Sequence, residues 1–245
     1  MKNIHYIYGW HAVLAILKQR PENVTTVFLL QQREDDRAQQ LFALTQSARI
    51  SVQAVSKQVL DKKSHGENHQ GVVAECRSQD VLNENDLVKL LDDLHEDPYL
   101  LILDGVQDPH NLGACLRSAD AAGVHAVIIP KDKSVGITPI VRKVSCGASE
   151  VVPIVQATNL ARVMKMLKSR NIWLFGADDK AEQSLYQADL KGAVALVMGA
   201  EGAGMRRLTR EHCDVLISIP MHGSVSSLNV SVATGICLFE ALRQR

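Results

Sequence analysis

The hydrophobic pattern changes near residue 98, and most of the predicted architecture follows from the part beyond it. There, short runs rich in Val, Ile and Leu alternate with segments of helical spacing. This alternation predicts an α/β fold with a mostly parallel sheet that is covered by helices on both faces. The predicted strands are 99–103, 124–129, 151–155, 172–175, 194–198 and 215–219. The predicted helices are 112–122, one begun by Thr138 and Pro139, 159–168 with Thr158 as its cap, 205–211, and a last one running to about Arg243.

Before residue 78 the pattern predicts a smaller α/β unit. Its segments, in order, are helix 12–18, strand 24–30, helix 34–48, strand 50–55, helix 58–62 and strand 71–76. The polar loop 62–71 contains two lysines and two histidines. We expect this loop to be either a solvated turn or a contact with an anionic polymer.

Residues 78–97 differ from both flanks in charge. They hold seven acidic residues and one basic residue, so their net charge is −6, whereas each flank carries +3. Leucines at 87, 90, 91 and 94 recur at helical spacing and predict one amphipathic helix. The simplest interpretation is an acidic linker helix docked on a domain. The formal net charge of zero argues against a nucleic-acid binder, but the mildly basic flanks leave that class open.

The cysteines and the apolar runs exclude several classes of protein. Five widely spaced cysteines without a C-x-x-C pair argue against a disulfide framework and a structural zinc site, so no metal is expected. The N-terminus lacks the apolar core of a signal peptide, and no apolar run approaches the ~18 residues of a membrane span. These features predict a reduced, cytoplasmic protein without a membrane segment. Cys115 and Cys237 lie in apolar helical surroundings and are expected in the core, not as nucleophiles.

Ligands of parallel α/β sheets bind at the carboxyl ends of strands, so the loops after Leu103, Met198 and Ile219 form the candidate site. The first loop leads to Asn111, a possible helix N-cap, and to Arg117 six positions later. An arginine among small apolar helix residues is either a snorkelling surface side chain or a guanidinium fork for a phosphate.

The second loop, 199–205, has three glycines, which let a ligand approach the backbone closely. Its order G-x-x-G-x-G is neither the dinucleotide fingerprint nor a Walker A loop. Glu201 within it lies close to predicted helix N-termini, which favour negative charge. In the third loop, Ser226, Ser227 and Asn229 can cap the last helix or face a ligand. The three loops together suit the binding and orientation of two ligands better than hydrolysis.

Segments 111–117, 196–204 and 219–233 resemble, in order and spacing, the three motifs of the SpoU (TrmH-like) RNA ribose 2′-O-methyltransferases of the SPOUT superfamily. The trio is highly specific, and the resemblance covers about 98–245. The N-terminal part, including 69–72, is similar to the ribosomal-protein-like RNA-binding domain of the subgroup that methylates a guanosine 2′-OH of 23S rRNA. The resemblance thus implies an RNA substrate-binding domain at 1–77, an acidic linker at 78–97 and a methyltransferase domain at 98–245 that binds S-adenosylmethionine (SAM).

The same resemblance implies SAM as methyl donor, a C-terminal trefoil knot, and a homodimer with each site near the subunit interface. The residues that it carries over to catalysis or substrate contact are Arg117, Asn111, Glu201, Ser227 and Asn229. The residues assigned to the cofactor are Gly199, Ile219 and Leu228, through their main chain, with Met198 and Gly204 beside them. Because a guanidinium with a pKa above ~12 is a poor base, we expect Arg117 to grip a phosphate and polarise the hydroxyl.

Two other classes stay open at this point, namely a non-catalytic RNA-binding protein of the same fold and a nucleotide-cofactor oxidoreductase. The second would need a true G-x-G-x-x-G followed by an acid about twenty residues on, which is missing. Within the methyltransferase class, tRNA is the rival substrate. Arg206, Arg207 and Arg210, after the second loop, could add phosphate contacts or form a solvated helix face.

Overall fold

The structure, a computed structural model, describes residues 4–33, 35–77 and 81–245. Glu34, the predicted start of a helix, and residues 78–80, the predicted start of the linker, lie outside the described residues.

The chain divides into two compact units. The first comprises Met1–Asp80 together with Cys146–Val151, and the second comprises Val81–Ser145 together with Val152–Arg245. Each unit has a sheet of its own.

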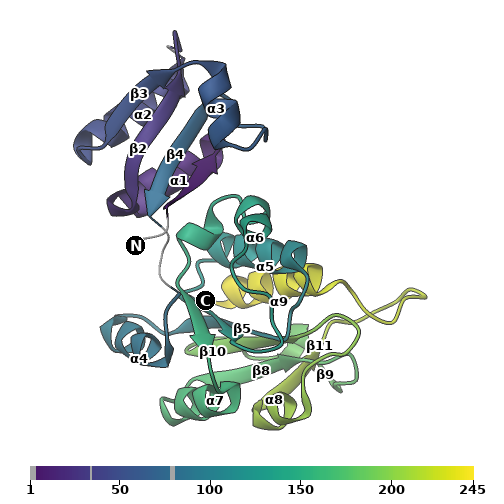
Figure 1. Cartoon of the computed structure of the whole chain (residues 1–245). Helices are drawn as coiled ribbons and strands as arrows, with labels where there is room; N and C mark the ends of the chain where they lie inside the picture. Colours follow the sequence, from purple (N-terminus) through teal and green to yellow (C-terminus); the bar gives the residue numbers. More distant parts are fainter. Residues whose placement is uncertain (1–3, 34, 78–80) are drawn as a thin grey trace. The chain divides into compact units, whose positions relative to one another are not determined.

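The first unit is a four-stranded sheet in the order β1–β4–β2–β3, in which β4 is antiparallel to both neighbours and β3 is parallel to β2 (Figure 1). Its main core contains Trp10, Val13, Ile16 and Leu41, which pack between the sheet and the first two helices. The strands are β1 (Ile4–Tyr8), β2 (Val24–Leu30), β3 (Ser51–Val55) and β4 (Val72–Arg77). The helices are α1 (Trp10–Gln19), α2 (Asp36–Ser47) and α3 (Lys57–Lys63), with a 3₁₀ turn at Pro21–Asn23.

The predicted segments of this unit are confirmed to within two residues at each end, except that the strand β1 was missed. This strand is short and lies at the edge of the sheet, where it pairs only with β4. Its apolar and polar positions are therefore too few to stand out as a pattern.

The second half of the polar loop 62–71 is tied to the first unit. His69 is buried, and its Nδ1 accepts a hydrogen bond at 2.9 Å from the backbone N–H two residues further on. The neutral ring therefore carries its proton on Nε2, which lies 3.0 Å from Asp61 Oδ1. Gln70 accepts hydrogen bonds from Trp10 through both its side-chain and its backbone oxygen. Residues 69–71 of the loop are thus held by hydrogen bonds within the first unit, unlike the solvated turn that was one of the two expectations.

The second unit is built on a seven-stranded sheet in the order β7–β6–β5–β10–β8–β11–β9, and all its neighbouring strands are parallel. The strands are β5 (Tyr99–Asp104), β6 (Ala126–Pro130), β7 (Ile154–Ala157), β8 (Trp173–Ala177), β9 (Gln183–Ser184), β10 (Val194–Gly199) and β11 (Val215–Ser218). The helices are α4 (Glu84–Asp93), α5 (Pro109–Ala121), α6 (Pro139–Val144), α7 (Leu160–Ser169), α8 (Arg207–His212) and α9 (Val230–Gln244), with 3₁₀ turns at Ala148–Glu150, in the first unit, and Leu185–Gln187.

Helices cover both faces of this sheet, as predicted. Figure 1 shows α5, α6 and α9 on one face and α4, α7 and α8 on the other. Between the sheet and the pair α4 and α7 lies a core that includes Leu87, Ile102, Met164 and Leu174. The predicted α/β class with a parallel sheet is confirmed; the trefoil knot stays a prediction.

Three local predictions in this unit are wrong. The N-cap of α5 is Asp108, not Asn111, because Pro109 takes the first helical position. The N-cap of α7 is Asn159, not Thr158, since Asn159 Oδ1 accepts from the backbone N–H of Arg162 at 3.0 Å. The strand expected from residue 151 begins at Ile154 instead, after a 3₁₀ turn and Pro153, which has no N–H to give to a ladder. The two-residue strand β9 was not predicted.

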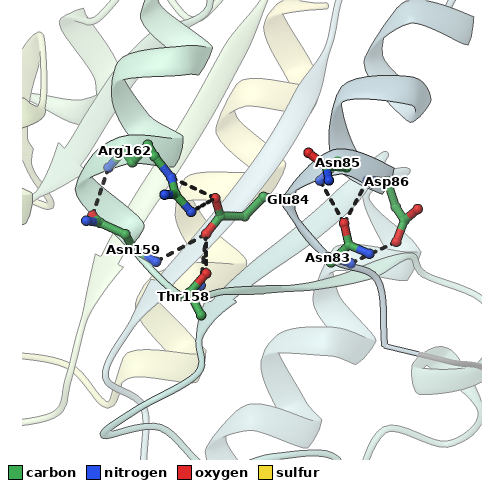
Figure 2. A network of polar contacts seen from close by, with 7 residues as sticks. All are labelled: Asn83, Glu84, Asn85, Asp86, Thr158, Asn159 and Arg162. Atoms are coloured by element: carbon green, nitrogen blue, oxygen red, sulfur yellow. Dashed lines mark hydrogen bonds and ion pairs between the residues drawn. The ribbon is translucent and has the colours of Figure 1, made fainter.

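Glu84 joins α4 to the start of α7 (Figure 2). Its Oε1 accepts from the hydroxyl of Thr158 at 2.7 Å and from the backbone N–H groups of Thr158 and Asn159. Its Oε2 accepts from Arg162 Nε at 3.0 Å and also from Nη2. A capping box formed by Asn83 and Asp86 starts the same helix. The amphipathic helix predicted from the leucine spacing is thus present, and it belongs to the second unit.

Candidate active site

One cavity of about 660 Å³ lies at the carboxyl edge of the parallel sheet in the second unit. The loops that follow β8, β10 and β11 surround it, and α8 and α9 complete its wall. The sequence singled out the loops after β5, β10 and β11, of which the first contributes no residue to the lining, and it missed the loop after β8. The lining comprises 177–180, 198–205 and 226–228 together with Arg210, Ile217, Ile219, Met221, Val230 and Ala233.

The glycine loop, residues 199–205, folds back on its own start. Ala200 and Gly204 exchange backbone hydrogen bonds of 3.0 and 2.9 Å. A Cβ at Gly199 would lie 2.2 Å from Gly204 C and 2.2 Å from Met205 N, so only glycine fits at that position. Gly202 and Gly204 have φ values of +73° and +68°, a left-handed conformation that glycine adopts without strain. At its three glycines the loop thus presents backbone without a side chain to one side of the cavity.

Three polar side chains, from α5, the glycine loop and the start of α9, meet beside this cavity. Asn111 Nδ2 donates to Glu201 Oε2 at 3.0 Å. Asn229 Nδ2 donates to Asn111 Oδ1 at 3.0 Å and to Glu201 Oε1 at 3.3 Å. Asn229 is also the N-cap of α9, since its Oδ1 accepts from the N–H and the hydroxyl of Ser231. Both roles expected of Asn229, cap and site residue, are therefore compatible in one conformation.

The ten residues singled out from the sequence divide into three groups. Those that line the cavity are Met198, Gly199, Glu201, Gly204, Ile219, Ser227 and Leu228. Asn111 and Asn229 hold Glu201 from outside the lining. Arg117 is exposed on α5, six positions after Asn111. Since each helical residue advances by ~100°, Arg117 points ~120° away from Asn111 around the helix.

Asp178 and Arg210 form an ion pair in the cavity wall that sequence reasoning missed. Arg210 Nε lies 2.6 Å from Asp178 Oδ2, and the backbone N–H of Lys180 donates to Oδ1. Burial raises the pKa of Asp178, but the hydrogen bonds from Arg210 and Lys180 outweigh it and hold that pKa below its ordinary value. The position of Asp178 directly after β8 could have revealed it, because carboxyl ends of parallel strands carry the sites of such sheets.

The other two arginines after the glycine loop also have carboxylate partners. Arg206 binds the buried Asp104, and Arg207 lies 3.6 Å from Glu211 on α8. Arg206 precedes α8, so it is not on the helix face that the sequence suggested. Arg206 and Arg210 both form ion pairs with carboxylates while their side chains stay partly exposed, and the expected phosphate contacts stay a prediction.

Cys115 and Cys237 are buried, as predicted. Burial raises the pKa of the Cys115 thiol to about 11 and that of Cys237 to about 12, so neither is a ready thiolate nucleophile. Among the described residues, no cluster of three His, Cys, Asp or Glu side chains could hold a metal ion. Within the same ranges, no helix has the length and apolar character needed to cross a membrane.

Two family models match this chain. The model described as "SpoU rRNA Methylase family" matches residues 98–239, which is more than half of the chain. The model described as "RNA 2'-O ribose methyltransferase substrate binding" matches residues 6–81. The chain belongs to the SpoU rRNA methylase family, and the resemblance inferred from the three motifs is confirmed.

Several curated relatives carry the name 23S rRNA (guanosine-2'-O-)-methyltransferase RlmB. Those of Salmonella typhimurium (strain LT2) and Escherichia coli (strain K12) are each 59% identical over 239 residues, which covers 98% of this chain and 98% of the relative. The relative from Shewanella oneidensis is 57% identical over 247 residues and covers 100% of this chain and 99% of its own length. The similarity therefore extends through both units.

Solved structures of the same family share this fold. The SpoU methyltransferase AviRb from Streptomyces viridochromogenes, in complex with AdoMet, matches with a TM-score of 0.75 and 26% identity, covering 99% of this chain and 90% of that chain. An AdoMet-bound rRNA methyltransferase from Sinorhizobium meliloti matches with a TM-score of 0.74 and 25% identity, covering 98% and 87%.

Proposed function

We propose that this chain transfers a methyl group from SAM to the 2′-OH of a guanosine in 23S rRNA. The observation that carries the proposal is the identity of 57–59% over nearly the full length with relatives named for that reaction. The hydrogen bonds that join Asn111, Glu201 and Asn229, one residue from each motif, support it from within the chain. We assign residues 98–245 to SAM binding and catalysis, 1–77 to RNA binding and 78–97 to an acidic linker.

The size and the lining of the cavity support the assignment of SAM to it. Its volume of about 660 Å³ lies within the ~300–1,000 Å³ of small-molecule sites. Met198, Ile219 and Leu228 give it apolar walls, and Gly199 lines it without a side chain. When bound there, SAM supplies a methyl group activated by its positive sulfonium. We therefore assign the main chain around Gly199, Ile219 and Leu228 to the cofactor, with Met198 and Gly204 beside them.

The role of the chain's own side chains in this reaction is to orient the ribose hydroxyl. Alignment of two reactants can supply a large part of a rate acceleration. Glu201, fixed by the amides of Asn111 and Asn229, holds the glycine loop against α5 and α9. We assign Ser227, exposed at the cavity, to the ribose. Arg117 would bind the adjacent phosphate through its planar fork and draw charge from the hydroxyl.

We also propose a homodimer with each active site near the subunit interface and a trefoil knot in the second unit. Arg117 points away from Asn111 within its own chain. In a dimer with each active site near the subunit interface, its side chain can lie close to an active site. On α9, Val232, Phe239 and Leu242 are exposed at 51%, 49% and 40%, which is an apolar surface suited to a subunit contact. Light scattering on the purified chain tests the dimer, since a monomer at micromolar concentration would contradict it.

The first unit would bind the rRNA. Lys62 and His65 are exposed in the part of loop 62–71 that precedes His69, and we assign both to phosphate contacts. This activity would belong in the cytoplasm, where ribosomal RNA is made and modified in bacteria.

Mapping 2′-O-methyl groups in rRNA and tRNA from cells with and without this protein tests the proposed function. The expected result is the loss of one guanosine mark in 23S rRNA and its return when the wild-type chain is supplied. The purified chain with SAM should methylate a 23S rRNA fragment at the same nucleotide. Loss of a tRNA mark alone would overturn the ribosomal assignment, and no lost mark at all would favour a non-catalytic RNA binder.

A further inference from the structure

Asp104 is a buried carboxylate at the edge of the active site to which the motifs assign no role. It is the last residue of β5, and its side chain has no exposed surface. In the sheet it stands in register with Gly199, the last residue of β10, where the glycine loop begins. The carboxylate therefore lies directly beside the start of the loop that lines the cavity.

This carboxylate is held by Arg206, which follows the glycine loop directly. The backbone N–H of Arg206 donates to Oδ2 at 2.8 Å, and its Nε donates to Oδ1 at 2.6 Å. Nη2 contacts the same Oδ1. A buried carboxylate is tolerated only where it is paired and hydrogen-bonded, so this arrangement fixes both the backbone and the side chain of Arg206.

Apart from the hydrogen bonds of the Glu201 side chain, the far end of the glycine loop has few other attachments. Residues 201–204 are exposed, and two of them are glycines in the left-handed conformation. The hydrogen bonds between Ala200 and Gly204 close the loop on itself without attaching it to another element. The position of the loop backbone is therefore set by β10 at one end, by the side chain of Glu201 in the middle and by Arg206 on Asp104 at the other end.

We propose that the Asp104–Arg206 pair positions the glycine loop for SAM, so that Asp104 and Arg206 are positioning residues for the cofactor. The inference rests on the proposed assignment of SAM to this cavity. An ion pair that served folding alone would change the stability of the chain and leave the affinity of the folded protein for SAM unchanged. A positioning pair must change that affinity, because the backbone that contacts SAM moves when its anchor is lost.

The test compares Asp104→Asn, Arg206→Gln and Arg206→Lys with the wild-type full chain. Asp104→Asn keeps the shape of the side chain without its charge, and Arg206→Lys keeps the charge without the fork. Arg207→Gln is the matched control, because it removes the same charge one position away from a pair that is exposed and 3.6 Å long. The measurements are the Kd of SAM by calorimetry, the KM for SAM and kcat on a 23S rRNA fragment, and the thermal midpoint.

We expect Asp104→Asn and Arg206→Gln to raise both the Kd and the KM for SAM at least about tenfold, the effect of losing one charge-assisted hydrogen bond. Arg206→Lys should fall between them and the wild type, and Arg207→Gln should match the wild type in its Kd and KM for SAM. At saturating SAM, kcat should stay within about threefold of wild type, because the interaction removed is one of binding. If Asp104→Asn does not fold, Arg206→Lys is compared with the wild type instead, because the lysine still gives the buried Asp104 carboxylate a positive partner.

A Kd for SAM that stays at the wild-type value in Arg206→Lys and Arg206→Gln, whatever their thermal midpoints, overturns the positioning role. A fall in affinity of equal size in Arg207→Gln overturns it too. The proposed function can fail independently of this inference. A wild-type chain that binds SAM but methylates no 23S rRNA contradicts the proposed substrate, and the Kd values of the variants for SAM still decide the role of Asp104. A wild-type chain that binds no SAM overturns both.

Discussion

Asn111 on α5 and Glu201 in the glycine loop are 90 positions apart in the chain, and the amide of the first donates to the carboxylate of the second at 3.0 Å. Asn229, at the start of α9, donates to the other oxygen of the same carboxylate and to the carbonyl oxygen of Asn111. Two amide donors thus converge on an acceptor that offers two oxygens. The triangle joins the segments that follow β5, β10 and β11, so its geometry fixes how these three segments meet.

Replacing Glu201 by Gln should break this triangle while the size of the side chain stays nearly the same. The amide has only one oxygen, so its NH₂ group must face a donor of Asn111 or Asn229, which leaves a polar group without an acceptor. Loss of one charge-assisted hydrogen bond, worth ~1.5–3 kcal/mol, should lower kcat/KM by about ten- to a hundredfold. Steady-state methylation of a 23S rRNA fragment measures the change.

Glu182→Gln makes the same chemical change at an exposed position and serves as the control. It should keep the wild-type kcat/KM. If Glu201→Gln matched this control, the triangle would not set the geometry of the site, and Glu201 would have to act through contacts other than Asn111 and Asn229.

The sequence predicted the sheet of the second unit better than it predicted local contacts. Continuous Val, Ile and Leu runs identify buried parallel strands because both faces are covered. Asn111 was interpreted as a cap because it precedes an apolar run. Proline favours the first position of a helix, so Pro109 instead predicts Asp108 as the N-cap. The Asn111 side chain is therefore not used as a cap and donates to Glu201.

The hydrophobic pattern of the sequence does not predict contacts between residues that are far apart in the chain. Asp104 and Arg206 are 102 positions apart, and their pairing depends on how the glycine loop folds back on β10. Asp178, by contrast, could have been found, because it closely follows the predicted strand 172–175 and the strand-end rule applies to it. Periodicity gives the elements and the edge that carries the site, while side-chain pairs across loops need the three-dimensional register.

Arg117→Lys should separate bidentate orientation from simple charge attraction. Lysine keeps the positive charge but presents a point charge in place of a planar fork. If Arg117 grips a phosphate next to the target ribose, kcat should fall by about ten- to a hundredfold, because misalignment of the reactants costs rate at this scale. The KM for SAM should not change. Single-turnover methylation of a 23S rRNA fragment provides the measurement, and a rate close to wild type would contradict the bidentate account.

Gly199→Ala should weaken the cofactor site through backbone displacement. The new Cβ would meet backbone atoms of Gly204 and Met205 at 2.2 Å, and backbone cannot yield as a flexible side chain can. Overpacking of this kind costs ~1–3 kcal/mol, so the affinity for SAM should fall by about five- to a hundredfold. Gly136→Ala is the matched control, because a Cβ there meets nothing within 4 Å. Calorimetry with SAM compares the two, and equal affinities would mean that the loop does not bind the cofactor through its backbone.

Glu84→Gln should destabilise the second unit in a pH-dependent way. Burial raises the pKa of Glu84, but hydrogen bonds from Thr158, Arg162 and Asn159 outweigh burial and lower it below the ordinary value. A carboxyl group with a lowered folded-state pKa stabilises the fold fully above its unfolded pKa of ~4.3, and this contribution disappears as the pH falls through the folded-state pKa. Loss of the charge should therefore cost ~1–3 kcal/mol near neutral pH and progressively less below about pH 4.3.

Thermal unfolding of wild type and Glu84→Gln, followed by calorimetry at pH 7 and at decreasing pH values below 4, measures this dependence. Glu211→Gln is the control, because Glu211 is more than half exposed and its ion pair with Arg207 is 3.6 Å long. Exposed pairs of this kind contribute ~0–1 kcal/mol, so the control should change the thermal midpoint little at any of these pH values. A Glu84→Gln deficit that stays constant as the pH falls would mean that packing of α4, and not the charge of Glu84, joins this helix to α7.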